Sequence, residues 1–564
     1  MVKGILKISQ INKIPISKYS LRAFFLTLLV FFCLFAKAES YSVATRHHLA
    51  TDIGIKVLED GGNAIDAAVA VAFALAVVNP SAGNLGGGGF MLLHLAETGE
   101  SISIDYRERA PIKAYEKMFQ DNSGKVVKGL SLNSILASGV PGTVSGMFYA
   151  SENFGTVNIK TLINPSIELA KKGFALSDFQ AKNLNKYKQK FLKNKEAKNI
   201  FTRLNGFSEG DIIVQKNLAK TLEKIAQNGK EEFYSGNTAK KIADFFKING
   251  GILSLTDLNK YKLRILEPIC GSYRKYEICS MAPPSSGGIA LIQILNILEN
   301  FNLSKFDHNS KEYLDILISA MDFAYKDRAK YLGDPDFVKV PQDLLTSKKY
   351  AYEIYQKIKG QRSPSKINIK ILEGEETTHF SIIDKWGNAV SNTYTLNTAY
   401  GSGIIPTGTG ILMNNQMDDF SSKPGHPNAY GLIGSEANKI EPKKTPLSSM
   451  SPTIVLRDKR PFLITGSPGG STIITSVLQE ILNVLDFNMS LKASSEKKRI
   501  HFQHLPDILF HEQFVESLIK SIKKEKKTVS RSLGEIHSIL IKKDIVEAYS
   551  DKRRPDGKAS AVYE

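Results

Sequence analysis

Cysteine is scarce in this chain, with three in 564 residues, and the ten histidines show no spacing typical of metal ligands. Both observations argue against a metal centre, and no organic cofactor is implied. Long hydrophobic runs are also few: the run at 23–35 has thirteen residues, too few to span a bilayer comfortably. No internal repeat is evident. The remaining composition is that of a globular protein large enough to bury an extensive core.

Acidic residues are missing from residues 1–38, which carry six lysines and arginines. The apolar run at 23–35 follows most of these basic residues, and Ala36-Lys37-Ala38 comes next, which predicts a signal peptide cleaved after Ala38. Phe32 stands before Cys33, where a lipoprotein signal requires a small residue. We therefore expect simple export to the periplasm or the medium, with membrane contact only during export.

Positive charge is in excess: the net charge is +18, of which +12 remains outside residues 1–38. Much of the excess lies in lysine-rich stretches such as Lys182–Lys198 and Lys520–Lys527. Such runs are typical of solvated helix faces, and no interleaved aromatic residues or base-reading motif accompany them. The pattern argues against nucleic acid as a partner.

Two cysteines remain after the signal peptide, and they flank a turn. If Arg274-Lys275 is a two-residue turn, Cys270 lies opposite Cys279 in a non-hydrogen-bonded pair, where side chains approach closely. An oxidising compartment would allow a cross-strand disulfide there. Two free core cysteines are the equally weighted alternative.

Residues 377–397 read as a β-hairpin. Thr377–Ile383 is rich in β-branched and aromatic residues, Asp384–Asn388 is a turn signal, and Ala389–Asn397 returns as a second strand. With Trp386 at the centre of the loop, Thr377 faces Thr395 across the ladder, and side-chain alternation places Asn397 on the same face. The pair is either a nucleophile with a supporting hydroxyl or an ordinary cross-strand contact.

Helix and loop signals precede this hairpin. Thr51–Asp60 predicts a helix that ends at Gly61-Gly62, and Asn63 can cap an alanine-rich helix, apolar nearly all round and hence buried, that ends before Pro80. Gly83–Met91 lacks the Lys-Ser/Thr of a phosphate loop, so close backbone approach explains its glycines. The polar stretch Ser363–Glu376 predicts an exposed linker that tolerates a chain break.

Several motifs together closely resemble the γ-glutamyltranspeptidases, in the same order along nearly the whole chain from about Ser42 to Val562. They are RERAP (107–111), GVPGTV (139–144), PPSSGG (283–288), DRAKYLGDPDFV (327–338), TTHFSIID (377–384), NNQMDDF (414–420), PLSSMSPTI (446–454) and GSPGGS (466–471). The resemblance implies an N-terminal-nucleophile hydrolase with a four-layer αββα sandwich of the α+β class. It also implies a precursor cut into a large subunit, 39–376, and a small subunit, 377–564, within a single intertwined unit.

By this resemblance Thr377 is both the self-cleaving residue and the catalytic nucleophile. Its hydroxyl attacks the carbonyl of Glu376, and hydrolysis of the resulting ester frees the Thr377 amine. An α-amino group titrates near pH 7.7–8.0, so it can act as a base near neutrality. His379 falls on the same strand face and is the alternative base, although a strand histidine is more often structural.

The resemblance also implies the remaining site residues. Gly469 and Gly470 form the oxyanion hole. Arg107, with Ser448 and Ser449, binds the substrate carboxylate. Asp419 binds its ammonium, with further contacts from Asn397 and Gln416, and Tyr430 gates the pocket from a lid at Pro424–Gly431. Taken singly, each has a plain alternative: a Gly-Gly turn, a surface Arg107–Glu108 ion pair, a solvated Asp418-Asp419 turn and a serine helix cap.

The expected activity is γ-glutamyl transfer from glutathione, or another γ-glutamyl compound, to water or to an amino-acid or peptide amine. A related acylase or amidase is the alternative among enzymes, and Asp419 with the intact lid favours glutamyl over glutaryl substrates. An unprocessed, inactive homologue acting as an exported binding protein is the alternative outside them. The subunits of the same precursor are partners of each other.

Overall fold

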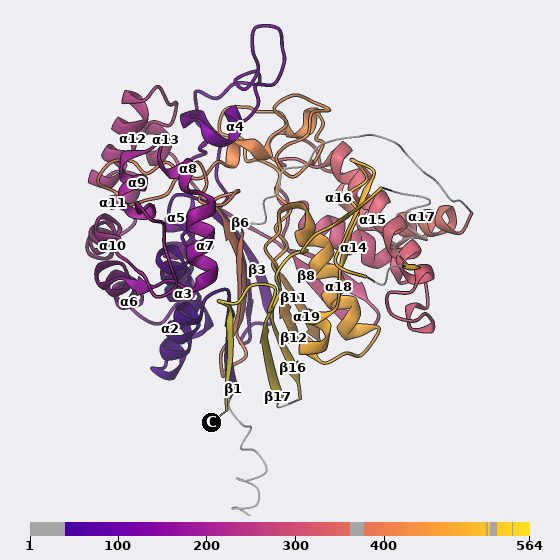
Figure 1. Ribbon diagram of the computed structural model, residues 1–564. Helices are drawn as coiled ribbons and strands as arrows, with labels where there is room; N and C mark the ends of the chain where they lie inside the picture. Colours follow the sequence, from indigo (N-terminus) through magenta and orange to yellow (C-terminus); the bar gives the residue numbers. More distant parts are fainter. Residues whose placement is uncertain (1–39, 361–376, 515–516, 519–526, 544, 564) are drawn as a thin grey trace, which may run out of the picture. The chain divides into compact units, whose positions relative to one another are not determined.

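Two β-sheets stacked face to face form the centre of the structure, and helices cover the outer face of each (Figure 1). The computed structural model describes residues 40–360, 377–514, 517–518, 527–543 and 545–563. The expected signal peptide, the linker at 363–376 and most of the lysine run at 520–527 lie outside the described residues. The layer order is the αββα sandwich that the motifs imply.

The first sheet has seven strands, and Thr377 leads into one near its middle. From one edge to the other the order is β18 (Lys558–Tyr563), β1 (Ser40–Thr45), β9 (Thr378–Ile383), β10 (Ala389–Thr395), β2 (Gly88–Leu95), β3 (Glu100–Asp105) and β6 (Arg264–Leu266). Strands from before residue 361 and from after residue 376 therefore pair within one sheet: β1 lies between β18 and β9, and β2 lies beside β10.

The second sheet has six strands, all paired antiparallel. Its order is β17 (Ile545–Ser550), β16 (His537–Lys542), β12 (Arg460–Thr465), β11 (Thr453–Arg457), β8 (Tyr276–Ser280) and β7 (Ile269–Tyr273). The smaller sheets contain β13 (Ile500–His501), β14 (Ile508–His511) and β15 (Lys527–Ser530), and separately β4 (Phe174–Ala175) and β5 (Ile212–Ile213).

One helical layer packs on the first sheet and consists mostly of residues between 48 and 259. Its helices are α2 (His48–Glu59), α3 (Ala64–Val78), α5 (Thr143–Phe154), α6 (Ile159–Lys172), α7 (Asp178–Lys186), α8 (Lys188–Phe191), α9 (Lys195–Phe201), α10 (Lys216–Asn228), α11 (Glu231–Tyr234), α12 (Asn237–Ile248) and α13 (Leu255–Asn259). The short helix α4 (Leu130–Asn133) lies apart from this layer, beside the segment Gln416–Asp419.

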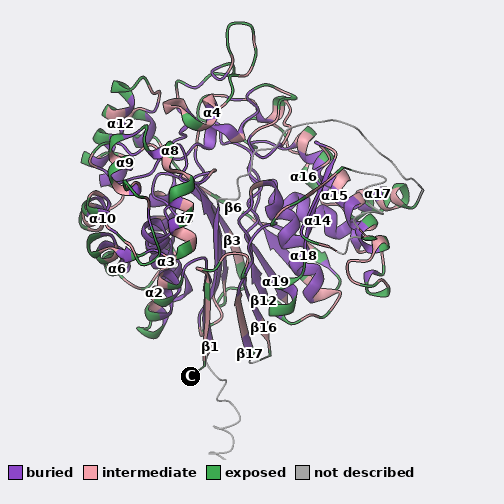
Figure 2. Ribbon diagram, viewed as in Figure 1, coloured by how far each residue is buried: buried purple, intermediate pink, exposed green. Residues whose placement is uncertain are grey.

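The other layer packs on the second sheet. It contains α14 (Gly287–Leu298), α15 (Lys311–Tyr331), α16 (Gln342–Leu345), α17 (Lys348–Gly360), α18 (Ile473–Leu485) and α19 (Leu491–Glu496). Burial follows the layers: the central strands of both sheets, α3 and α14 are buried, whereas α6, α10 and α12 expose their outer faces (Figure 2).

Three apolar clusters hold the four layers together. One lies between the first sheet and its helices, a second between the second sheet and α14, α15 and α18, and a third, which includes Ala44, Leu92, Ile454, Ile464 and Ile539, joins the two sheets. Strand alternation explains this arrangement, because each strand sends one set of side chains outward to helices and the other inward to the opposing sheet.

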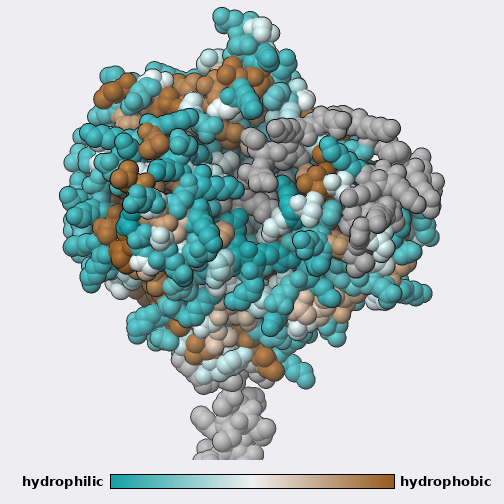
Figure 3. Space-filling model, viewed as in Figure 1, coloured by the Kyte–Doolittle hydropathy of each residue, from teal (hydrophilic) through white to brown (hydrophobic). Residues whose placement is uncertain are grey.

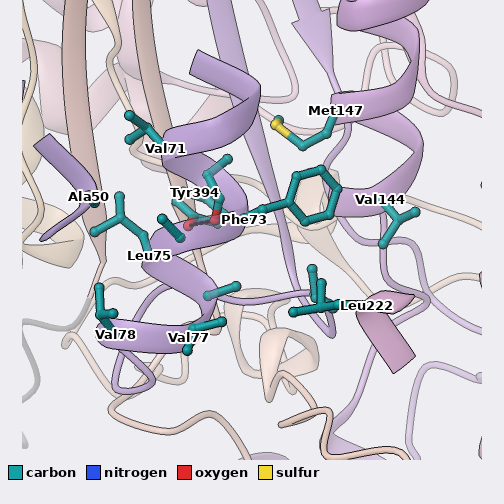
Figure 4. Packing of buried hydrophobic residues seen from close by; sticks show 14 of the residues in the cluster. Ala50, Val71, Phe73, Leu75, Val77, Val78, Val144, Met147, Leu222 and Tyr394 are labelled. Carbon is teal, nitrogen blue, oxygen red and sulfur yellow. Dashed lines mark hydrogen bonds between the residues drawn. The ribbon is translucent and has the colours of Figure 1, made fainter. Parts of the chain in front are cut away.

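Helix α3 is the most deeply buried helix of the first layer, as its apolar sequence predicts. The Asn63 side chain accepts hydrogen bonds from the N–H groups of Ile65 and Asp66, and the Asp66 carboxylate accepts one from the Asn63 N–H, which completes a capping box. All fifteen residues of the helix are buried. Phe73 packs towards Val144 and Met147, and the Tyr394 hydroxyl donates to the Ala72 carbonyl at 2.8 Å (Figure 4).

Both hairpin registers expected from the sequence are confirmed. In β9–β10, Ala389 pairs with Ile383 and Tyr394 with Thr378. In β7–β8, Cys270 pairs with Cys279, and a disulfide joins them. Some boundaries differ from those expected: α2 begins at His48 rather than Thr51, because His47 accepts a capping bond from the Leu49 N–H, and β10 ends at Thr395 rather than Asn397. The end of α2, at Glu59, and the start of β9, at Thr378, each differ by one residue.

The surface of the face in Figure 3 is mostly hydrophilic, with scattered apolar patches. Lys182, Lys186 and Lys188, from the first lysine-rich run, are exposed or half-buried on α7 and α8, as expected of solvated helix faces. Within the described part of the chain, no helix is both long and apolar enough to cross a membrane.

Candidate active site

Thr377 lines a cavity at the end of the first sheet, immediately before β9. Its Oγ1 lies 3.3 Å from Oγ1 of Thr395, the residue that the hairpin register places opposite it. Its carbonyl oxygen accepts a hydrogen bond of 2.6 Å from Nη1 of Arg46. The cavity is lined by Arg107, Arg328, Thr377, Thr395, Asn397, Gln416, Asp419, Tyr430, Leu432, Leu447, Ser448, Ser449, Met450, Gly470 and Ile473.

Arg107, which is buried, and Asp419, which is partly buried, form an ion pair in this cavity. Nη2 of Arg107 lies 2.5 Å from Oδ2 of Asp419, and Nε2 of Gln416 donates to the same oxygen at 2.6 Å. Burial raises the pKa of Asp419, and the charge and hydrogen bond of Arg107 oppose that rise. A cation and an anion side by side suit a ligand carrying both an α-carboxylate and an α-ammonium.

Glu108 lies behind this pair and is fully buried. Its Oε2 is 3.7 Å from Nη1 of Arg107, so the two residues do interact, but in the interior rather than at the surface. Burial raises the pKa of Glu108 to about 7, although the Arg107 charge opposes the shift. Gly88 leaves the space for its carboxylate, since a Cβ there would lie 2.8 Å from Oε2.

Ser448 and Ser449 enter the cavity wall from a loop braced by Pro283–Gly288. Ser286 donates to the Ser448 carbonyl through both its N–H, at 2.8 Å, and its hydroxyl, at 2.6 Å. Arg328 on α15 donates from Nε to the Ser286 hydroxyl at 2.9 Å and from Nη2 to the Ser449 hydroxyl at 3.1 Å. The two serines are therefore buried and held by another loop, and they do not cap a helix.

Gly469 and Gly470 follow β12 and lead into α18. Their φ values of 133° and 57° lie in the left-handed region that disfavours other residues. A Cβ on Gly470 would lie 2.4 Å from the ring of Tyr430, which excludes any larger residue. Gly470 lines the cavity with Thr377, where a backbone N–H can meet a developing oxyanion.

Tyr430 is buried over the cavity, within the loop expected to form a lid. Its hydroxyl donates to the Asn397 carbonyl at 2.7 Å. Asp418 supports the loop by accepting from the Ala429 N–H at 2.9 Å and the Ser131 hydroxyl at 2.6 Å. Burial raises the pKa of Asp418 to about 6, so the Asp418-Asp419 segment is an interior element and not a solvated turn.

Asn397 reaches the cavity by a route that strand alternation does not predict. It lies beyond the end of β10 with φ of 80°, and its N–H donates to the Thr395 hydroxyl at 2.9 Å. Its side-chain amide donates to the Asn415 carbonyl at 3.0 Å. The residue lines the cavity because the chain turns there, which corrects the argument from alternation.

His379 is wholly buried between the sheets. Its two ring nitrogens lie 2.8 Å from the Thr393 hydroxyl and 3.1 Å from the Ser381 hydroxyl. Burial holds its pKa well below 6.5. With both nitrogens engaged by other hydroxyls, His379 acts as a structural residue and not as a base for Thr377.

The described residues contain one group of potential metal ligands with suitable proximity: Cys270, Glu277 and Cys279. Both cysteines belong to the disulfide. The group lies on β7 and β8, away from the Thr377 cavity.

Arg328 and Glu108 were not expected as site residues. Arg328 lies within a motif that carried the family resemblance, and α15 is a helix with charged residues along its length, so nothing else in its sequence singles out Arg328. Glu108 was read only as a surface partner of Arg107. The Arg328–Ser449 contact is not visible in sequence, since the two residues are 121 positions apart, and the burial of Glu108 depends on the tertiary packing around it.

Known proteins share this sequence and arrangement. The family model for gamma-glutamyltranspeptidase matches residues 50–561. Glutathione hydrolase proenzyme from Escherichia coli K12 is 47% identical over 90% of this chain and 89% of its own length. The crystal structure of Helicobacter pylori gamma-glutamyltranspeptidase covers 57% of this chain and 92% of its own, with 48% identity and a TM-score of 0.55.

A cephalosporin acylase from Bacillus halodurans, at 24% identity, shares the fold with a TM-score of 0.79 over 93% of this chain and 96% of its own. The match to the family model and the identity to the curated proenzyme extend over most of the sequence, and the hydroxyl pair, ion pair and glycine loop lie together in one cavity. The chain belongs to the γ-glutamyltranspeptidase family.

Proposed function

We propose that this chain is a γ-glutamyltransferase with glutathione hydrolase activity, made as a precursor that cleaves itself between Glu376 and Thr377. The observation that carries the proposal is the Thr377 hydroxyl, 3.3 Å from Thr395, in one cavity with the Arg107–Asp419 pair and Gly470. A nucleophile, a binder of amino-acid charges and an oxyanion donor are the three parts that acyl transfer from a γ-glutamyl compound requires.

Cleavage begins when Oγ1 of Thr377 adds to the carbonyl carbon of Glu376. The C–N bond breaks, the acyl group passes from nitrogen to oxygen, and the nitrogen takes up the hydroxyl proton. Water then hydrolyses the ester, which releases the Glu376 carboxylate, the Thr377 hydroxyl and a free Thr377 amine. Each step uses only the chain and water.

Turnover repeats the same chemistry on a donor. The free amine takes the hydroxyl proton as Oγ1 attacks the γ-carbonyl carbon, and the leaving amine departs with a proton. A γ-glutamyl ester on Thr377 remains. Attack by water yields glutamate, and attack by an amino-acid or peptide amine yields a new γ-glutamyl amide. The hydroxyl of Thr395 supports Oγ1 by hydrogen bonding.

Glutamyl substrates suit the cavity better than glutaryl ones. A glutaryl group lacks the α-ammonium, so the Asp419 carboxylate would have no positive charge of the ligand to pair with. An unmatched charge is costly where water is largely excluded. Asn397 and Gln416 add polar contacts, and Tyr430 closes the pocket from the lid. The fold shared with an acylase is compatible with either substrate, so this charge argument separates them.

We also propose that the protein is exported. Residues 1–38 have the basic start, apolar stretch and A-x-A ending of a signal peptide. The disulfide between Cys270 and Cys279 fits an oxidising compartment outside the cytoplasm. N-terminal sequencing of the mature protein from the periplasm or medium tests this; a mature chain that begins at Met1 and stays in the cytoplasm contradicts it.

The central test is a denaturing gel of the purified protein together with release of glutamate from glutathione. We expect two chains, the smaller beginning at Thr377, and Thr377→Ala should stay uncut and inactive. A single uncut chain after prolonged incubation would favour the inactive binding protein. Cut protein that hydrolyses glutaryl but not γ-glutamyl amides would favour an acylase.

A further inference from the structure

A buried charged network joins the segment before β16 to the main chain of Thr377, and neither of its two central residues, Arg46 and Glu535, lines the substrate cavity. Arg46, directly after β1, donates from Nη1 to the Thr377 carbonyl at 2.6 Å, and its Nε lies 3.4 Å from Oε2 of Glu535. Arg46 is 3% exposed and Glu535 1%. None of the reaction steps above uses either residue.

Glu535 is itself held from several directions. Oε2 lies 3.5 Å from Nε of Arg554, Oε1 lies 3.3 Å from Nε2 of His537, and its backbone N–H donates to the Ser467 hydroxyl at 2.9 Å. Burial alone would raise the pKa of Glu535, but the positive charges around it outweigh burial and lower that pKa. Glu535 therefore stays ionised and anchors Arg46.

The guanidinium of Arg46 must lie close to the nitrogen that cleavage releases. The nitrogen and carbonyl oxygen of one residue are separated by three covalent bonds, so a donor 2.6 Å from the Thr377 oxygen is within about 6 Å of the Thr377 nitrogen. The Thr377 carbonyl is contacted by Nη1 of Arg46, whereas Glu535 contacts its Nε. The group of the Arg46–Glu535 pair that touches Thr377 is therefore the positive one.

We propose that Arg46, oriented by Glu535, is a positioning residue that holds the Thr377 main chain and keeps the released Thr377 amine in its neutral, proton-accepting form. The inference rests on the proposed function, because it concerns the amine that self-cleavage produces. A like charge nearby disfavours protonation of an amine, so Arg46 increases the fraction of base at neutral pH. In the precursor the same nitrogen is an amide, so this charge effect begins only after cleavage.

Other charged groups surround the amine and are common to all the variants below. Arg107, Arg328 and Asp419 line the substrate cavity with Thr377. Arg554 and Asp556 line a second cavity with Arg46. His379 and His537 lie between the sheets, and burial keeps the first of them uncharged. Their contributions stay constant when Arg46 or Glu535 alone is changed.

The test is the pH dependence of kcat/KM for glutathione in cut, purified protein. Arg46→Met removes the charge and should move the acidic limb up by roughly 0.5–1 pH unit, with most activity regained near pH 9. Glu535→Gln removes a negative charge and should move the limb down by a smaller amount. Arg46→Lys should return the limb towards wild type. KM should change little, since no donor contact is lost.

Arg274→Met is the matched control. Arg274 also pairs with a carboxylate, Asp486, and donates to two carbonyls, but it lies at the β7–β8 turn. Its limb should not move. Limbs that move in the same direction in Arg46→Met and Glu535→Gln, or that do not move in either, overturn the inference, because a merely structural network has no reason to shift them oppositely.

Different results would contradict the proposed function and the role of Arg46. If Arg46→Met is not cut, the limb of Glu535→Gln decides: a downward shift supports the inference and an unmoved limb overturns it. A wild-type protein that is uncut or inactive contradicts both the proposed function and this inference. A cut and active wild-type protein whose variants have the same acidic limb of kcat/KM contradicts the inference alone.

Discussion

The two hairpins β9–β10 and β7–β8 place like residues directly opposite each other, yet only one pair has the surroundings of a catalytic site. Thr377 faces Thr395 near the middle of the first sheet, where other segments of the chain surround it. Cys270 faces Cys279 at the edge of the second sheet, with Cys270 exposed. The register of each hairpin brings its two residues together. The residues that pack around each pair decide whether it can take part in catalysis or only links two strands.

The largest expected effect is on catalysis at the Thr377 hairpin, through the charged residues that line its cavity. Asp419→Ala removes one partner of the ion pair with Arg107, and we expect kcat/KM for glutathione to fall about 1,000-fold while self-cleavage persists. Kinetics and a denaturing gel on the same preparation measure both. Equal loss of cleavage and turnover would instead make Asp419 a structural residue. Asp458→Ala, at an exposed position, is the control.

The second effect belongs to the other hairpin. Replacing Cys270 and Cys279 by serine should lower the free energy of unfolding by roughly 2–3 kcal/mol, because the disulfide no longer restricts the unfolded chain. Glutathione turnover should stay within about twofold of wild type. Urea unfolding with an activity assay tests this, and two free thiols in unreduced wild-type protein would contradict the disulfide.

A third change sharpens the comparison within one strand. Thr395→Val keeps the side-chain shape but removes the hydroxyl beside Thr377, so kcat should fall roughly 10- to 100-fold. Thr393→Val is matched: it lies on the same strand, and its hydroxyl bonds His379 instead. That control should lose about 1 kcal/mol of stability and little activity. Similar kcat losses in both would remove the special role of Thr395.

The smallest effect is a dependence of stability on pH in the acidic range, from Asp418 beside the active site. Burial raises the pKa of Asp418 to about 6, above its unfolded value near 4, so its contribution to stability is greatest at low pH and is lost as pH rises. Between pH 5 and 6 wild type should lose about 1 kcal/mol relative to Asp418→Asn. Urea unfolding at several pH values measures this. A difference in unfolding free energy between the two proteins that stays constant from pH 5 to 6 would contradict the raised pKa.

Local elements were readable from the sequence because their determinants lie close together along the chain. Asn63 and Asp66 form the capping box within four residues, and the turn at Asp384–Asn388 sets the register of its hairpin. Where the chain leaves regular structure, strand alternation no longer predicts where a side chain points. Asn397 lies past its strand with positive φ, so the period of two that predicted its direction no longer applied.

The site was predictable as a set of residues, through motifs that resemble a known family, but not as a set of contacts. The wall formed by Arg328 and Ser449 and the burial of Glu108 behind Arg107 depend on segments far apart in sequence. Hydrogen bonds and desolvation act over a few ångströms of space, and sequence patterns report only neighbours along a helix or strand.

The sequence by itself determined the capped and buried helix α3, the registers of both hairpins and the pairing of Thr377 with Thr395 and of Cys270 with Cys279. It did so because backbone geometry and short-range hydrogen bonding decide these features. Only the tertiary structure decided that the Thr377 carbonyl meets Arg46, 331 residues away, and that the hydroxyl opens into a cavity with opposite charges. Packing two sheets between helices brings these groups together, and their burial in a low-dielectric interior gives the contacts their strength.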